Sequence, residues 1–317
     1  MKTLLVWTGA DDGPLCAALA RIPDLRIVQA ASAAEAAATM PEADGMVTSV
    51  VPWDAVLMAA LRSAPRLKWL QVLNAGYDNL EALGLPARID LSTTGSLGSE
   101  LVAEHALALL LALFRELPRS FAATPPSPSH TAQLRAGIRT LRFQTIVIVG
   151  FGPIGRCLAR LLLAAGARPI ALARRPRTEA GIEVRALASL LATLADAAGV
   201  AICAPLNAST RRLIDRRAFA ALRPGAVLVN VSRGAVIDTQ ALCEALDSGH
   251  LAGAGLDVTD PEPLPAGHPL WGRPNVIVTP HVAFAGGGAR EQQQRIEFVL
   301  DNAARFASGT PQPHAHR

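Results

Sequence analysis

The chain has 317 residues, of which half are apolar and 18% are charged. This composition excludes a disordered protein, and the length suits two domains better than one. The formal net charge of +4 is too small to indicate nucleic acid as a partner, although it suits an anionic small molecule. The four cysteines lack the spacing of a zinc cluster or a disulfide framework, which favours buried thiols in a reducing compartment.

No stretch of the sequence has the length and apolar character of a membrane helix. The most apolar helical stretch, residues 101–114, is too short and contains Glu104 and His105. After Lys2, a short apolar run soon meets acidic residues, which indicates a first strand rather than a signal peptide. We therefore expect a cytoplasmic protein with neither a membrane nor a nucleic acid as its partner.

Strand-like and helix-like runs alternate through the first part of the chain. The expected strands span residues 3–8, 26–30, 45–49, 68–73 and 88–92, and the expected helices span 15–21, 33–39, 53–61 and 79–83. This alternation predicts right-handed strand–helix–strand units and a parallel sheet.

The next element is a helix from Ser99 to Phe114 that is apolar on nearly every side. Ser99 is expected to cap its first turn, where acidic residues follow. Such a helix must be buried on most faces, either between two domains or at a subunit interface. Residues 118–129 are rich in Pro, Ser and Ala and are expected to form an irregular connection.

A strand expected at residues 144–149 contains five successive β-branched residues and is followed at once by Gly-x-Gly-x-x-Gly and a helical run. Gly150 would permit the tight turn, Gly152 would let a pyrophosphate approach the backbone, and Gly155 would let the helix pack close to the strand. The helix N-terminus would offer free N–H groups to the phosphates. The motif predicts a dinucleotide site, with a plain structural turn as the alternative.

Strands and helices alternate again in the rest of the chain. The expected strands span residues 168–173, 200–204, 226–232, 252–258 and 275–279, and the expected helices span 188–197, 215–222, 239–248 and 288–307. The last helix would be long enough to return to the first domain. His314 and His316 are better explained by a frayed end than by a metal site, so we expect no metal.

Three polar residues follow strands of this second part: Arg233, Glu262 and His281. In open α/β sheets, ligands bind at the carboxyl edge of the strands. Any one of the three alone is better explained as a surface charge. Three of them at the edge that also carries the glycine loop predict a functional site.

The sequence resembles the D-isomer-specific 2-hydroxyacid dehydrogenase family over nearly the whole chain. The strongest block, residues 229–282, contains Asn-Val-Ser-Arg-Gly, Leu-Asp-Val-x-x-x-Glu-Pro and Thr-Pro-His. Earlier matches are the glycine loop, the Val-Ala-Glu-His-Ala run at 102–106 and the turn at 74–78. Two departures are the Arg-Phe-Gln run at 142–144, in place of the usual Gly-Lys, and a linker at 118–140 without the tryptophan often found there.

The resemblance implies two doubly wound α/β domains with parallel sheets. A Rossmann cofactor domain (98–284) would be inserted into a flavodoxin-like substrate domain (1–97 and 285–317), with a homodimer formed through the 101–114 helix. The implied catalytic residues are Arg233, Glu262 and His281. The residues expected to contact the cofactor are Gly150, Gly152, Pro153, Ile154, Gly155, Arg174, Arg175, Ala204, Pro205, Thr210, Val231, Ser232, Asp257, His281 and Ala283. The residues expected to contact the substrate are Val51, Ala75, Gly76, Tyr77, Arg233 and His281.

These residue types fit the reduction of a small 2-oxo acid, such as glyoxylate or hydroxypyruvate, to the D-2-hydroxy acid. The planar guanidinium of Arg233 can hold the substrate carboxylate with two parallel hydrogen bonds. His281 can donate a proton near neutral pH, and Glu262 would fix its tautomer and favour the imidazolium.

The cofactor preference is predicted from the end of the 168–173 strand. An NAD enzyme usually carries an acid there for the ribose hydroxyls, whereas this chain has Arg174 and Arg175. The arginines favour NADP(H), with NAD(H) also possible. The alternative is a solvated basic loop.

Three other functions fit the same resemblance. Formate dehydrogenase shares the fold but needs no proton donor. A cofactor-sensing, corepressor-like binding protein would retain the same three polar residues. An NAD-dependent dehydrogenase of the phosphoglycerate type is the third alternative.

Overall fold

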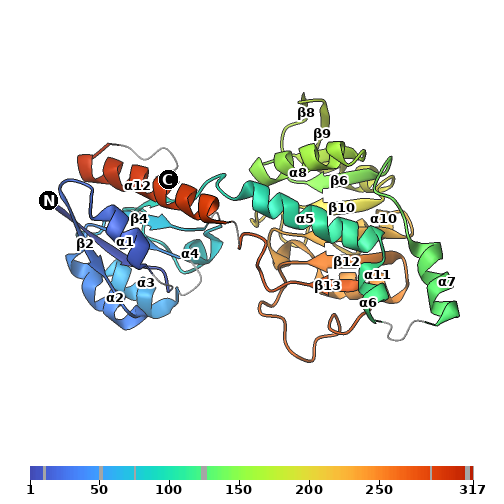
Figure 1. Cartoon of the computed structure of the whole chain (residues 1–317), viewed down its shortest axis with the longest axis horizontal. Coiled ribbons are helices and arrows are strands. Elements are labelled where there is room, and N and C mark those ends of the chain that lie inside the picture. The colour runs from blue at the N-terminus through green and yellow to red at the C-terminus, as the bar shows by residue number, and fades with distance from the viewer. Residues whose placement is uncertain are drawn as a thin grey trace. The chain divides into compact units, whose positions relative to one another are not determined.

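The computed structural model describes residues 1–9, 12–49, 53–74, 76–122, 127–285, 288–310 and 315–316. The chain divides into two compact units (Figure 1). The first comprises Met1–Leu97 with Gly287–Arg317, and the second comprises Gly98–Gly286.

The first unit is a six-stranded sheet covered by helices. Its strands are β1 (Lys2–Trp7), β2 (Leu25–Gln29), β3 (Gly45–Thr48), β4 (Trp69–Val72), β5 (Asp90–Ser92) and β14 (Ala315–His316), and its helices are α1 (Gly13–Leu19), α2 (Ala33–Thr39), the short η1 (Met40–Glu42), α3 (Ala55–Arg62), α4 (Asp78–Ala82) and α12 (Ala289–Ser308). The strand order is β14-β5-β4-β3-β1-β2, parallel except for β14. The five parallel strands have the flavodoxin-like order.

Alternate residues of β1 enter different cores because side chains of a strand alternate between its two faces. Leu4 and Val6 join the core that contains residues of α1 and α12, whereas Leu5 joins the core formed with α2 and α3. The ring of Phe306 stacks on Trp69 with centroids 4.7 Å apart, which fixes α12 on the sheet. The last helix therefore belongs to the first unit.

The second unit is an eight-stranded sheet. Its strands are β6 (Thr145–Val149), β7 (Arg168–Ala173), β8 (Arg177–Glu179), β9 (Ile182–Ala186), β10 (Gly199–Ile202), β11 (Ala226–Asn230), β12 (Leu251–Leu256) and β13 (Val276–Val278), and its helices are α5 (Ser99–Phe114), α6 (Leu117–Ala122), α7 (Pro128–Gly137), α8 (Pro153–Ala164), η2 (Leu187–Ser189), α9 (Leu190–Leu194), α10 (Arg216–Ala221), η3 (Gly234–Val236) and α11 (Thr239–Asp247). The order is β13-β12-β11-β10-β6-β7-β9-β8, and only β8 is antiparallel to its neighbour. This is the Rossmann order, with its topological switch between β6 and β10.

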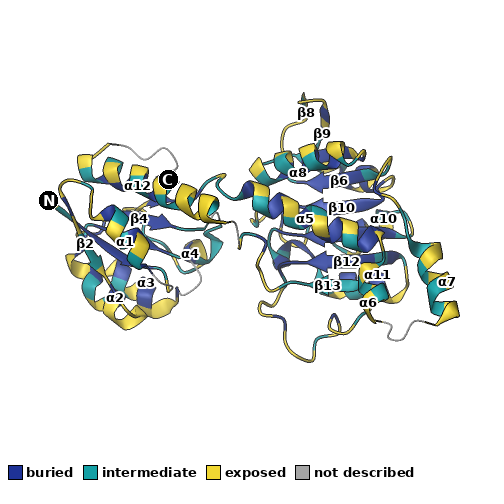
Figure 2. Ribbon diagram, viewed as in Figure 1, coloured by how far each residue is buried: buried dark blue, intermediate teal, exposed yellow. Residues whose placement is uncertain are grey.

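Helices cover both faces of this sheet. Ile146 and Ile148 of β6 join the core that includes α5 and α8, whereas Val147 and Val149 join the core with α9, α10 and α11. Figure 2 shows the central strands β6 and β10 buried between these layers. Both units are thus doubly wound α/β structures, which confirms the predicted fold class.

Local differences from the sequence predictions have simple causes. The N-cap of α5 is Gly98, with φ +78°, so the prediction that Ser99 caps this helix was wrong. Ser99 is the first helical residue, and no side chain makes a capping hydrogen bond at this end. The connection expected to be irregular contains α6 and α7, and α7 begins because Ser127 accepts a hydrogen bond from the His130 N–H while Pro128 fills the first helical position. The β8–β9 hairpin was not predicted because β8 is polar and largely exposed, and the apolar alternation of β9 is limited to Ile182 and Val184.

Among the helices that the structure describes, none combines the length and the apolar character that crossing a membrane requires.

The close contact between β6 and α8 gives a stability prediction. A Cβ at Gly155 would lie 2.2 Å from the Gly150 carbonyl oxygen, so Gly155→Ala should force backbone movement and cost about 1–3 kcal/mol in the free energy of unfolding. Gly152→Ser is the matched control, because nothing lies within 4 Å of its Cβ and serine is a good N-cap. Denaturant unfolding of the three proteins measures the difference, and equal stability of the two variants would contradict the argument.

Candidate functional site

The glycine loop occupies the switch point of the second unit. Gly150 has φ +100°, and a Cβ there would lie 2.5 Å from the backbone nitrogen of Ala204. The loop after β6 is thus packed against the residues that follow β10. Gly152, at the N-cap of α8, has open space where its Cβ would point. The predicted roles of Gly150 and Gly155 in the turn and in helix packing are confirmed, and the space at Gly152 suits a phosphate group.

Hydrogen bonds connect and brace the loops that follow β10 and β11. The Ser232 hydroxyl donates to the Ala204 carbonyl. Thr210 Oγ1 donates to the Pro205 carbonyl at 2.6 Å and accepts from the Asn207 N–H at 2.8 Å. The predicted cofactor residues on these two loops therefore lie together at the carboxyl edge of the sheet. Val231, which precedes Ser232, is buried.

Arg233 is held in place by the backbone on both sides. The buried Asn230 side chain, at the end of β11, donates to the Arg233 carbonyl at 2.9 Å and accepts from the Ser232 N–H at 3.0 Å. A Cβ at Gly234 would lie 1.9 Å from the carbonyl carbon of Thr259, so the two backbones touch. Arg233 is therefore fixed beside the segment that carries Glu262.

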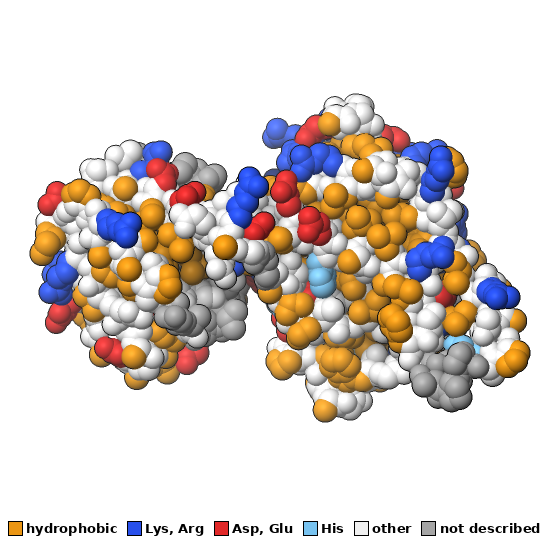
Figure 3. Space-filling view, viewed as in Figure 1, with side chains coloured by type: hydrophobic (Ala, Val, Ile, Leu, Met, Phe, Trp, Pro, Cys, Tyr) orange, Lys and Arg blue, Asp and Glu red, His pale blue; other side chains and the backbone are white. Residues whose placement is uncertain are grey.

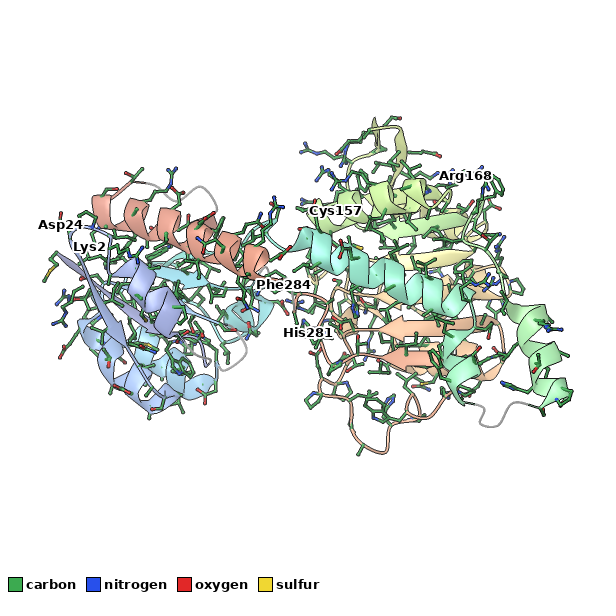
Figure 4. The ribbon with its side chains drawn as sticks, viewed as in Figure 1. Lys2, Asp24, Cys157, Arg168, His281 and Phe284 are labelled. Carbon is green, nitrogen blue, oxygen red and sulfur yellow. The ribbon has the colours of Figure 1, made fainter. Side chains whose placement is uncertain are left out.

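His281 and Glu262 form a hydrogen-bonded pair, with 2.5 Å between His281 Nδ1 and Glu262 Oε1. Both side chains are partly exposed, at 46% and 38%. His281 lies in the loop beyond the strand end of β13 (Figure 4). Its Nε2 is the ring nitrogen left for a ligand, because Nδ1 faces Glu262.

The pair shifts the pKa values of both partners. The hydrogen bond that His281 donates to Glu262, together with the charge of Glu262, raises the pKa of His281, against burial and the charge of Arg233. Burial raises the pKa of Glu262, but the hydrogen bond and charge of His281, a backbone hydrogen bond from Thr259 and the charge of Arg233 together hold that pKa below its ordinary value. The site therefore favours an imidazolium beside a carboxylate.

The Asp257 carboxylate, at the end of β12, binds the segment that carries His281. Its Oδ1 accepts from the Thr279 hydroxyl at 2.6 Å and the Val282 N–H at 2.9 Å, and its Oδ2 accepts from the Ala283 N–H at 3.0 Å. His105 of α5 lies 3.1 Å from Thr279 Oγ1. Asp257 is almost fully buried, so these donors satisfy a carboxylate with little access to water.

Arginines dominate the turn that follows β7. Arg174 and Arg175 are exposed, and no ion pair joins either of them to a carboxylate in the described part of the chain. Glu179 of the β8–β9 hairpin instead accepts from Arg156 of α8 and from Arg177 at 2.7 Å. The hydrogen bonds from these two arginines lower the pKa of Glu179 to about 2.

The substrate residues predicted in the first unit are only partly described. Val51 and Ala75 lie outside the described residues. Gly76 and Tyr77 lie between β4 and α4, and Tyr77 is the N-cap of that helix. Burial, followed by the charge of Glu81, raises the pKa of Tyr77.

Sequence reasoning gave no role to four residues of this region: Asn230, His105, Thr279 and Glu179. Two of them lie inside matched motifs, Asn230 in Asn-Val-Ser-Arg-Gly and Thr279 in Thr-Pro-His. His105 lies within the matched run at 102–106. A polar residue in an otherwise apolar helix was the available signal for His105, whereas nothing local pointed to Glu179.

Comparisons with known proteins agree with this geometry. The family model "D-isomer specific 2-hydroxyacid dehydrogenase, NAD binding domain" matches residues 107–283. A D-3-phosphoglycerate dehydrogenase of Mycobacterium tuberculosis is 36% identical over 279 residues, which are 85% of this chain and 50% of the relative. The chain thus spans about half the length of the mycobacterial relatives it matches.

Two relatives match over most of their own length. A glyoxylate reductase of Thermococcus litoralis is 33% identical over 282 residues, which are 86% of this chain and 83% of the relative. The crystal structure of an NADPH-dependent glyoxylate/hydroxypyruvate reductase from Sinorhizobium meliloti, in complex with NADP and sulfate, matches with a TM-score of 0.81 at 27% identity, covering 100% of this chain and 98% of the other. From its family match and its relatives, this chain belongs to the D-isomer specific 2-hydroxyacid dehydrogenase family.

Proposed function

We propose that the protein is an NAD(P)-dependent oxidoreductase that reduces a small 2-oxo acid, of the glyoxylate or hydroxypyruvate type, to the D-2-hydroxy acid. The observation that carries this proposal is the Glu262–His281 pair beside Arg233, at the strand edge that also bears the glycine loop. The open space at Gly152 fits a dinucleotide phosphate. The second unit would then be the cofactor domain and the first the substrate domain.

The chemistry follows from the residues. When bound, the reduced nicotinamide supplies a hydride to the substrate carbonyl carbon. Arg233 holds the substrate carboxylate with two parallel hydrogen bonds and polarises the carbonyl. His281 gives the proton on Nε2 to the oxygen that becomes the hydroxyl, while Glu262 stabilises the imidazolium beforehand. In the reverse direction, neutral His281 accepts that proton.

One observation bears on the alternatives. The raised pKa of His281 favours a reaction that needs a proton donor, which formate oxidation does not. A corepressor-like protein would have the same Glu262–His281 pair but would not catalyse a reaction. A phosphoglycerate-type dehydrogenase would have the pair and would also catalyse oxidation and reduction. Only activity separates these functions.

Subunit assembly and location are further parts of the proposal. Hydrophobic side chains gather over α5 on the visible face of the second unit (Figure 3), and Leu111 of α5 is 39% exposed. These features support a homodimer through α5. The proposed location is the cytoplasm.

The proposal is tested by following NADPH and NADH oxidation with a panel of 2-oxo acids that includes glyoxylate, hydroxypyruvate and 3-phosphohydroxypyruvate. Turnover of glyoxylate or hydroxypyruvate is the expected result. No turnover with any 2-oxo acid, together with tight cofactor binding, would favour the cofactor-sensing alternative.

Arg233 gives the first prediction of this section. Arg233→Ala should lose about 2–5 kcal/mol of transition-state binding, tens- to thousandsfold in kcat/KM. Arg233→Lys should recover little, because a lysine cannot form the planar two-point contact. Arg216→Lys, in an exposed ion pair with Glu244, is the control and should retain activity. A lysine variant at position 233 with near-normal kcat/KM would rule out the bidentate role.

The pH dependence of reduction gives the second. The hydrogen bond that His281 donates to Glu262 raises the pKa of His281, so Glu262→Gln should lower that pKa. Reduction needs protonated His281, and its loss of activity with rising pH should therefore begin at lower pH in the variant. Glu183→Gln, which disrupts an exposed pair with Arg185, should leave the profile unchanged. Superimposable profiles for Glu262→Gln and wild type would show that Glu262 does not act on His281.

The cofactor gives the third. NADPH should be preferred over NADH roughly ten- to a hundredfold, mainly in the Michaelis constant, because charge-assisted hydrogen bonds to the 2′-phosphate contribute about 1.5–3 kcal/mol. The preference should weaken with salt, since Arg174 and Arg175 are exposed. Ala173→Asp with Arg174→Ala should shift it toward NADH.

The control for this prediction is Arg217→Ala, which removes an exposed charge on α10. Both cofactors are compared in steady-state assays of all three proteins. Equal or better efficiency with NADH in the wild type would reject the assignment.

A further inference from the structure

A chain of three side chains links helix α5 to the segment that carries His281. Thr279 Oγ1 donates to Asp257 Oδ1 at 2.6 Å, and His105 Nε2 lies 3.1 Å from the same hydroxyl. The hydroxyl has a single hydrogen, which goes to the carboxylate. With its proton on Nε2, His105 then donates toward Thr279 Oγ1 and also faces Asp257 Oδ1, which lies 3.5 Å away.

This chain and the Asp257 backbone fix the segment on both sides of His281. The carboxylate also accepts the N–H groups of Val282 and Ala283, and the Asp257 carbonyl accepts the His281 N–H at 2.9 Å. The ring of Phe284 adds a second contact with the start of α5, because a Cβ at Gly98 would lie 2.2 Å from it.

His281 needs such support because of its backbone conformation. Its φ is +54°, in the left-handed region that non-glycine residues seldom adopt. A residue holds this conformation only when its surroundings impose it. Here the imposed conformation directs the imidazole to Glu262, at 2.5 Å.

We propose that His105 and Thr279 are positioning residues, which act through Asp257 to hold His281 in the orientation that proton transfer requires. This inference rests on the proposed role of His281 as proton donor. His105 and Thr279 would thus influence proton transfer without touching the substrate themselves.

The charged groups that face His281 support the inference. They are Glu262, Arg233 and Asp257, and the hydrogen bond to Glu262 has the largest effect on the His281 pKa. If the segment shifts, that short hydrogen bond lengthens first, and the pKa of His281 falls. Arg233 lies on a different segment, after β11, so substrate binding should be preserved.

The test is Thr279→Val, which has nearly the same shape but no hydroxyl. We expect kcat for reduction to fall roughly ten- to a hundredfold, the range for a misplaced catalytic group, with little change in KM for the 2-oxo acid. The alkaline limb of the pH profile should move to lower pH. NMR titration of the His281 ring, with its signal identified by its loss in His281→Asn, should show the same shift without any substrate.

Conservative variants separate positioning from folding. Thr279→Ser keeps the hydroxyl and should restore both kcat and the pH profile. His105→Gln keeps an N–H donor and should resemble the wild type, whereas His105→Leu should resemble Thr279→Val. Thr193→Val is the control, because it also removes a threonine hydroxyl, here one that donates to the Ser189 carbonyl at 2.9 Å at the start of α9.

The outcomes distinguish this inference from the proposed function. Wild-type kinetics and an unchanged His281 titration in Thr279→Val would overturn the inference. A loss of activity with unchanged pH dependence, or one that serine does not rescue, would also overturn it as a purely structural effect. Full activity of His281→Asn would instead overturn the proposed function, whatever the Thr279 variants do.

Discussion

The buried carboxylate of Asp257 constrains the whole edge of the second sheet. A carboxylate removed from water needs hydrogen-bond donors for both oxygens. A buried oxygen left without such a hydrogen bond costs about 1–3 kcal/mol in stability. Here the donors come from the Thr279 hydroxyl and the two N–H groups at positions 282 and 283. They are available only if the chain stops extending after β13, which is three residues long, and turns back over β12. The same turn supplies the hydrogen bonds to Asp257 and carries His281. The need to pair the buried carboxylate therefore determines where His281 lies.

A second constraint comes from the strand order. Reversal of the order at β6 and β10 leaves the loops after these two strands facing one another, and Gly150 allows them to meet because a Cβ there would touch the Ala204 backbone. The next strand along, β11, brings Ser232 and Arg233 to the same edge, where Ser232 bonds to Ala204 and Gly234 packs on Thr259. Each contact joins neighbouring strand ends, so the glycine loop and the Glu262–His281 pair occupy one continuous edge. The residues proposed to bind the cofactor and to donate the proton therefore come together within the second unit alone.

These constraints explain which features were predictable from the sequence. Apolar, β-branched runs such as residues 145–149 define buried strands, and residues that follow them fall at the carboxyl edge, so Arg233, Glu262 and His281 were found together. In the β8–β9 hairpin, Glu179 forms ion pairs with Arg156 and Arg177. Two residues of β9, Ile182 and Val184, reach the core, and this alternation is too short to mark the hairpin in the sequence. The His105–Thr279 hydrogen bond joins residues 174 positions apart, and only the folded packing of α5 reveals it. Helix α7 depends on a Ser-Pro start that also occurs in turns, which is why composition alone indicated an irregular connection.

The charges near β7 bear on the choice of cofactor in an asymmetric way. Four arginines lie in this region, but Glu179 engages Arg156 and Arg177, and with a pKa of about 2 it remains an anion throughout the working range of an enzyme. Arg174 and Arg175 are then the cations left to meet a 2′-phosphate. With NADH the same two arginines stay solvated at little cost, because exposed charges need no partner. An acid after β7 would instead repel the phosphate directly. If the proposed function holds, these arginines would favour NADPH without excluding NADH, whereas an acid at this position would disfavour NADPH by repulsion.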